Sequence, residues 1–179
     1  MKGRGNMNET LGFILQEQAV ESKPDIKFKN DKLIRFNTVL QEGDELNRNN
    51  RRYPTKILSE GLQDAYIKER IATDGWVGEC GHPITTDPAR LSNIDHTRIS
   101  HLIKKCWMEG SKVMGLIETA VTPHGTDMMN LAVHNKMKLA FSMRGFSKVV
   151  ENTANGSIVK GPLKIFTYDC EFCCYIKTF

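Results

Sequence analysis

Alternation of apolar and polar positions along this chain predicts several β-strands. A strand with one buried face repeats its side chains with a period of two, and such strands are rich in β-branched and aromatic residues. This pattern predicts strands over residues 32–41, 97–108, 113–121, 138–150 and 164–178. In the last of these, Tyr168 and Cys170 fall on an apolar face, while Asp169 and Glu171 fall on the opposite face.

Two stretches show helical spacing of apolar residues instead. Residues 55–71 place Leu58, Leu62 and Tyr66 on one face, and residues 126–137 carry a similar set. Turn-forming stretches separate these elements and lie at residues 47–54, 84–96, 109–112 and 151–157. Strands with two intervening helices predict an α+β, mainly β fold, as an antiparallel barrel or sandwich flanked by helices.

Composition narrows the class of protein. The 179 residues suit a single core, with 40% hydrophobic and 26% charged residues. No apolar run approaches the ~18 residues that cross a bilayer, and after Lys2 and Arg4 the chain is polar, so we expect no membrane contact and no signal peptide. The net charge of +4 is spread along the chain, which predicts no nucleic-acid groove. The five cysteines are an odd number and predict a reducing, cytoplasmic setting.

Three residues are candidates for nucleophilic chemistry. Ser142 alternates with Phe141 and Met143, which directs its hydroxyl away from their apolar face. His82 lies between Gly81 and Pro83, where a constrained backbone can hold an imidazole that acts as general base. Asp169 could orient that histidine, although a surface aspartate fits the residues equally well.

A zinc site is the rival chemistry. Cys170 and Cys173 form a C-x-x-C, and Cys80 and His82 are two positions apart. On a straight strand the two sulfurs of a C-x-x-C point to opposite faces, so we expect no metal and no other cofactor. Cys170 and Cys174 are more simply small core residues.

The order of short motifs resembles the prohead core protease family of tailed phages. In sequence these motifs are Asn-Arg-Asn-Asn-Arg-Arg-Tyr-Pro (47–54), Gly-Glu-Cys-Gly-His-Pro (78–83), Trp-Met-Glu-Gly (107–110) and Phe-Ser-Met-Arg-Gly (141–145). The resemblance covers about residues 33–172 and implies a herpesvirus-protease-like β-barrel of about seven strands. It implies Ser142 as nucleophile, His82 as base and Asp169 as the third member.

The resemblance also implies further roles and partners. The stretch Met143, Arg144 and Gly145 would form the oxyanion and substrate-binding region. The substrates would be the scaffold or core proteins and the major capsid protein, together with the enzyme itself, inside the assembling prohead in the host cytoplasm. Related core proteases prefer an acidic residue before the cut, which implies a basic pocket. Self-association into a homo-oligomer stays open.

Two further expectations concern the ends of the chain. Residues 1–25 are polar apart from Leu11–Leu15, so we expect a flexible arm, a propeptide or a short helix before a single protease domain over 26–179. Family members tend to continue past the aspartate with a Pro-Ser segment, whereas residues 170–179 are predicted to form an apolar strand here. That departure motivates an alternative function, a catalytically inactive capsid-assembly or scaffold module of the same fold.

Overall fold

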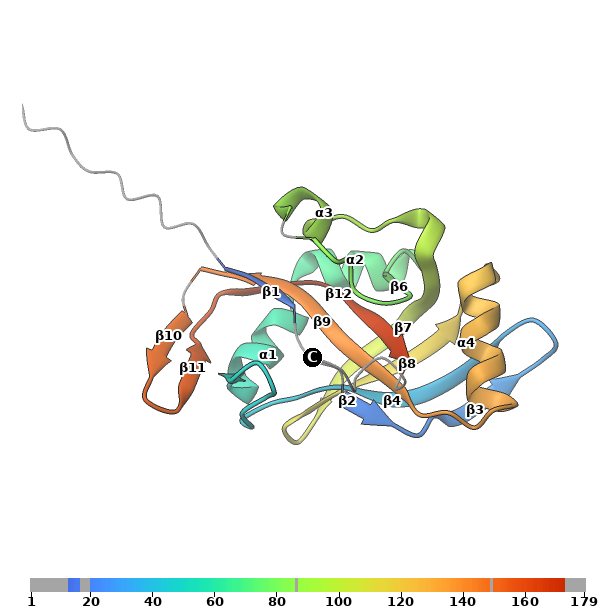
Figure 1. Ribbon diagram of the computed structural model, residues 1–179, viewed down its shortest axis with the longest axis horizontal. Helices are drawn as coiled ribbons and strands as arrows, with labels where there is room; N and C mark the ends of the chain where they lie inside the picture. The colour runs from blue at the N-terminus through green and yellow to red at the C-terminus, as the bar shows by residue number, and fades with distance from the viewer. Residues whose placement is uncertain (1–12, 17–19, 86, 149, 173–179) are drawn as a thin grey trace, which may run out of the picture.

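Three β-sheets make up most of the computed structural model, which describes residues 13–16, 20–85, 87–148 and 150–172 (Figure 1). The strands are β1 (Phe13–Gln16), β2 (Val20–Ser22), β3 (Asp25–Lys29), β4 (Ile34–Glu42), β5 (Arg51–Arg52), β6 (Val77–Glu79), β7 (Ile99–Glu109), β8 (Lys112–Thr119), β9 (Leu139–Ser147), β10 (Val150–Thr153), β11 (Gly156–Val159) and β12 (Leu163–Phe172). The helices are α1 (Thr55–Leu62), α2 (Ala65–Ala72), α3 (Pro88–Ser92), α4 (Pro123–Val133) and the 3-10 helix η1 (His96–Arg98).

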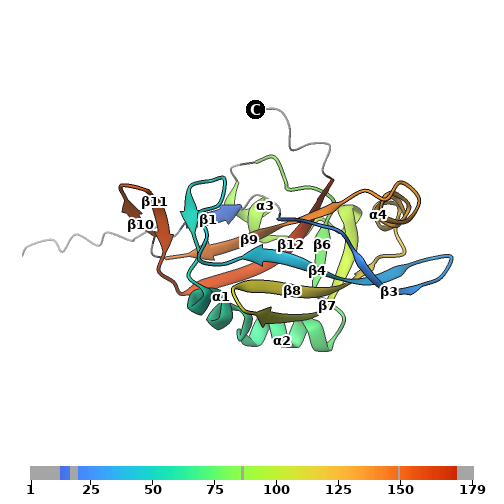
Figure 2. The ribbon, with the colours of Figure 1, turned by 90° about the horizontal axis from the view of Figure 1, so that it is seen from below.

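The two larger sheets are antiparallel throughout. One has the strand order β3-β4-β8-β7-β6, and the other has the order β1-β9-β12 with β2 also paired to β9. They meet where β6 approaches β12. The indole N–H of Trp76 donates to the carbonyl of Phe166 at 2.9 Å, and the backbones of Cys80 and Cys170, whose thiols are free, form an isolated parallel β-bridge. Figure 2 shows β9 and β12 running alongside β4 and β8. A third, small sheet of β10, β11 and β5 projects from one end.

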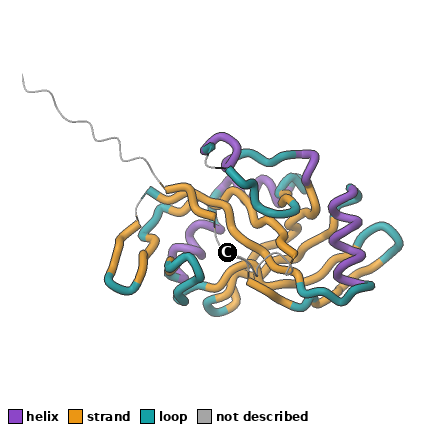
Figure 3. The backbone as a smooth tube through the Cα atoms, in the orientation of Figure 1, coloured by secondary structure: helices purple, strands orange, loops and turns teal. Residues whose placement is uncertain are grey.

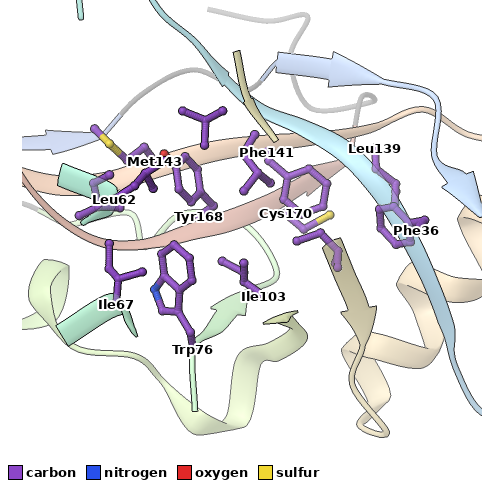
Figure 4. Close-up of a cluster of buried hydrophobic side chains, with 14 of the residues drawn as sticks. Phe36, Leu62, Ile67, Trp76, Ile103, Leu139, Phe141, Met143, Tyr168 and Cys170 are labelled. Atoms are coloured by element: carbon purple, nitrogen blue, oxygen red, sulfur yellow. The ribbon is translucent and has the colours of Figure 1, made fainter. Parts of the chain in front are cut away.

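The hydrophobic core lies between the two larger sheets (Figure 4). Trp76 meets Tyr168 edge-on with ring centroids 6.1 Å apart, and Phe36 lies 6.4 Å from Phe141. Full burial of one such side chain contributes about 1.5–3 kcal/mol. The core side of β12 therefore anchors the strand, while its other face is left for polar residues.

The predicted helix over 55–71 is wrong in one respect, because it consists of two helices. The first helix, α1, ends at Leu62, and the Asp64 side chain accepts the backbone N–H of Tyr66 at 2.8 Å to cap α2. An aspartate favours this N-cap position over a helix interior because its carboxylate satisfies an unpaired N–H there. The helix predicted over 126–137 begins earlier, at Pro123, with Thr122 as its cap.

Several shorter elements were not predicted. The stretch 84–96 contains α3, the turn over 151–157 is the tip of the β10–β11 hairpin, and β6 is a strand of three residues. Figure 3 shows how these short segments alternate with loops. Short elements are difficult to predict because periodicity needs a longer window.

The terminal predictions have mixed outcomes. Within the arm, Phe13–Gln16 and Val20–Ser22 pair with β9 as strands, so a short helix there is wrong. The final strand is present as β12, and the part of the prediction beyond residue 172 lies outside the described residues. The mainly β, α+β class is confirmed, and the closed barrel of seven strands stays a prediction. No helix in the described ranges is long and apolar enough to span a bilayer.

Candidate active site

The β9–β12 ladder brings two of the candidate residues together. Asp169 lies directly opposite Ser142 in the antiparallel register. Because side chains alternate along each strand, Arg144 shares the Ser142 face of β9 and Glu171 shares the Asp169 face of β12. All four therefore lie on one side of the ladder, away from the hydrophobic core.

A short loop after β6 delivers the third candidate, His82. Gly81 has φ +74°, a left-handed conformation that glycine adopts without strain, and its N–H donates to the Cys170 carbonyl at 2.8 Å. The preceding Cys80 N–H donates to the Arg98 carbonyl at 2.9 Å. The first of these hydrogen bonds fixes the loop against β12 beside Asp169, and the second ties it to η1.

His82 and Asp169 form a hydrogen-bonded pair. Nδ1 of His82 lies 2.7 Å from Oδ2 of Asp169, whose side chain is fully buried. Oδ1 of Asp169 also accepts the backbone N–H of Glu79 at 3.0 Å. An ionised carboxylate in this position favours the tautomer with the proton on Nδ1, which leaves Nε2 as the basic nitrogen.

Asp169 stays ionised in spite of its burial. Desolvation alone would raise its pKa, but the hydrogen bond and charge of His82, the charge of Arg144 and the Glu79 N–H outweigh it, so the net pKa is lowered. From the sequence, Asp169 could equally have been a surface residue. In the structure it is buried, so the surface alternative is wrong.

The Arg144 guanidinium is a partner of these acids and is itself fully buried. Its Nη2 donates to Glu79 at 2.8 Å and to Asp169 at 3.0 Å, and its Nε lies 2.6 Å from Asp169. Glu79 is also fully buried and accepts bidentate hydrogen bonds from Arg90, from Nη1 to Oε1 at 2.9 Å and from Nη2 to Oε2 at 2.5 Å. Glu79, Arg90, Arg144 and Asp169 therefore form one charge cluster. Within it, the Arg144 side chain is directed toward Asp169 and Glu79.

The remaining residues of the predicted oxyanion region occupy different places. Met143 packs in the hydrophobic core. Gly145 lies between two strands, with Leu15 of β1 and Ile165 of β12 as its neighbours. Both Arg144 and Gly145 lie in the middle strand of the β1-β9-β12 ladder, and an oxyanion donor from this stretch stays a prediction.

Glu171 is a site residue that the sequence analysis did not single out. The Ser142 hydroxyl donates to its Oε1 at 3.0 Å, and the same oxygen lies 3.8 Å from Nε2 of His82. The available signal was the shared face of Asp169 and Glu171. For Glu79, the only indication in the sequence was its position three residues before His82. Nothing in the sequence indicated that Arg90 and Arg98 contact Glu79.

A hollow of about 350 Å³ opens beside His82. Its lining residues are His82, Pro83, Ile84, Thr85, Arg90, Asp95 and Arg98. Ile84 is fully exposed at its rim. The Nε of Arg98 is buried and, within the described part of the chain, has no hydrogen-bond acceptor, although Glu79 lies 3.6 Å away.

The zinc alternative gains no support from the described residues. In the described ranges, no group of three or more His, Cys, Asp or Glu side chains is placed to hold a metal ion, and Cys173 and Cys174 lie outside those ranges. Burial raises the pKa of the Cys80 and Cys170 thiols.

With this geometry in view, similarity to known proteins decides the family. A profile described as "Prohead core protein serine protease" matches residues 5–166. The chain belongs to this family. The "Prohead core protein protease" of Enterobacteria phage T4 is 26% identical over 128 residues, which cover 71% of this chain and 57% of that protein. The present chain therefore spans somewhat more than half the length of the T4 prohead core protein protease.

The fold agrees with the family assignment. The solved structure of the bacteriophage T4 capsid assembly protease, gp21, superposes with a TM-score of 0.72 at 20% identity and covers 89% of this chain and 98% of that one. The mainly β architecture is thus shared by both proteins.

Proposed function

We propose that this protein is a serine endopeptidase that matures phage proheads. The observation that carries the proposal is the 2.7 Å contact between His82 and Asp169, made beside Ser142 in a chain of the prohead core protease family. A buried carboxylate, an oriented imidazole and a neighbouring hydroxyl are the three groups of a Ser-His-Asp triad. A herpesvirus-protease-like barrel is part of the same proposal.

The reaction follows from the roles of these groups. The Oγ of Ser142 attacks the scissile carbonyl carbon while Nε2 of His82 takes the hydroxyl proton. Asp169 stabilises the imidazolium, which then gives the proton to the leaving amine as the peptide C–N bond breaks. Water, activated by the same imidazole, hydrolyses the acyl-enzyme and returns Ser142 to its starting form.

The oxyanion is assigned to backbone donors near Arg144 and Gly145. One well-placed N–H donor contributes about 3 kcal/mol to the transition state of such reactions. The Arg144 side chain acts differently, because its contacts with Asp169 and Glu79 keep the third triad member ionised and in place.

The proposed substrates are the scaffold or core proteins, the major capsid protein and the enzyme itself, within the assembling prohead in the host cytoplasm. The hollow beside His82 supports an acidic residue next to the cut. Two guanidinium groups, those of Arg90 and Arg98, line it together with one carboxylate, that of Asp95, and a guanidinium is a strong hydrogen-bond donor to a carboxylate.

The test is co-expression with the scaffold or capsid protein of the same genome, compared between wild type and Ser142→Ala by intact mass. Fragments that depend on Ser142 are expected, and their ends define the cleavage motif. Intact partners in both samples, with the protein folded and bound to scaffold, would instead favour the inactive assembly module.

A further inference from the structure

We infer that Glu171 is a carboxylate latch that holds the Ser142 hydroxyl proton away from His82 in the resting protein. The inference rests on the proposed function, because it concerns how the same nucleophile is kept from reacting. It assigns a role to a residue outside the Ser-His-Asp set and defines a resting arrangement of the site.

The geometry of the hydroxyl carries the inference. A serine hydroxyl has one proton to donate, and here it is donated to Oε1 of Glu171 at 3.0 Å. Ser142 itself is only 1% exposed, so its hydroxyl has little access to water as an alternative acceptor. The same carboxylate oxygen lies 3.8 Å from Nε2 of His82, so the latch lies next to both reacting groups.

This arrangement is unproductive for acyl transfer. A carboxylate is a much weaker base than an imidazole, so Glu171 cannot activate the hydroxyl that it holds. A negative charge next to Oγ also opposes the oxyanion that forms when Oγ attacks a carbonyl. Catalysis therefore requires the Glu171 side chain to move away.

Glu171 is placed so that it can move. Its side chain is 23% exposed, so it has access to solvent. Asp169, by comparison, is fully buried and tied to both Arg144 and the Glu79 backbone. Within β12, one acid is therefore fixed for catalysis and the next acid on the same face can swing out.

The first test measures the reactivity of Ser142 with a fluorophosphonate probe, which needs no protein substrate. We expect Glu171→Ala to raise the second-order labelling rate by about 10-fold or more, because a hydrogen bond to a charged acceptor is lost. Loss of structure cannot produce such a gain. Glu171→Gln serves as a second variant, and Glu109→Ala, at the far end of β7, is the matched control.

The outcomes separate the latch from the proposed function. Labelling of wild type that disappears in Ser142→Ala, with no gain in either Glu171 variant, would overturn the latch and leave the protease assignment standing. No Ser142-dependent labelling in wild type or in either Glu171 variant would overturn both.

The second test uses the ¹⁵N resonance of His82 Nε2. With Glu171 present, Ser142→Ala should leave this resonance in place, because the hydroxyl is donated elsewhere. In the Glu171→Ala background the same substitution should shift it, because the hydroxyl then donates to Nε2. A shift of equal size in both backgrounds would contradict the latch.

Discussion

Ser142 and Asp169 are direct partners across the β9–β12 ladder, so the nucleophile and the acid of the candidate triad are held by one backbone register. His82 reaches the same point from a loop that is itself hydrogen-bonded to β12. The relative placement of the three groups thus depends on strand pairing and not on side-chain packing alone.

Asp169→Asn should lower kcat by about 10³–10⁴-fold, because an amide in place of the carboxylate permits the wrong histidine tautomer. Steady-state cleavage of a peptide taken from the scaffold checks this. Asp31→Asn, on an exposed loop, is the control and should be unchanged. An Asp169→Asn enzyme within about 10-fold of wild type would remove Asp169 from the triad.

Arg144→Met should destabilise the fold by about 3–5 kcal/mol, since it leaves the buried carboxylates of Glu79 and Asp169 without their shared cation. Urea unfolding measures the loss. Adding Glu79→Gln should cost less than the sum of the single changes, because the two side chains are in direct contact. Additive losses would show that the pair is not coupled.

Arg144→Met should also change the acid sensitivity of folding. The lowered pKa of Asp169 contributes stability that is present above its unfolded pKa and is lost as pH falls through the folded pKa. Without Arg144 that pKa should rise toward the unfolded value, so the loss should be smaller and should be complete at a higher pH. Unfolding curves at a series of acidic pH values test the shift, and an unchanged profile would contradict it.

His101 should make stability fall as the pH drops from about 6.5 to about 4. Its burial lowers its pKa to about 4, in spite of the opposing effects of Asp169 and the Tyr168 carbonyl. In this window the unfolded state binds a proton that the folded state does not, which is worth about 3 kcal/mol in total. His101→Gln should flatten that slope in urea unfolding, while the exposed His134→Gln should not.

Gly78→Ala should destabilise the junction of β6 and β12. A Cβ there would lie 2.2 Å from the Tyr168 carbonyl oxygen and 2.4 Å from Cε1 of His101. We expect a loss of about 1–3 kcal/mol or more, as for overpacked cores. Gly75→Ala, whose Cβ would meet side chains at 3.3 Å or beyond, is the control. Equal thermal unfolding midpoints would contradict the close approach.

Arg98→Gln should reduce kcat/KM by about 10–100-fold for peptides with an acidic residue at the cut, the range expected for one charge-assisted hydrogen bond. Peptides with a neutral residue there should lose little. Arg98→Lys should recover part of the difference, and the surface change Arg48→Gln should have no effect. A uniform loss for both peptides would point to a structural role for Arg98.

Periodicity along the chain was sufficient for the longer strands and for the presence of helix within 55–71 and 126–137, but not for the helix boundaries. The β12 prediction placed Tyr168 and Cys170 on the core face and Asp169 and Glu171 opposite, and the structure has this alternation. A period of two fixes which residues share a face, but it contains no information about which strand lies opposite. The break between α1 and α2 depends on a single capping residue, Asp64, and was missed for that reason.

The sequence by itself determined the fold class, the two faces of the strands and the family, because these depend on local periodicity and on the order of short motifs. Only the tertiary structure decided that Asp169 is buried and paired with His82, that Arg144 bridges Asp169 and Glu79, and that Glu171 holds the Ser142 hydroxyl. Burial and charge pairing are set by residues far apart in the chain, and a buried carboxylate cannot be told from a surface one by its neighbours in sequence.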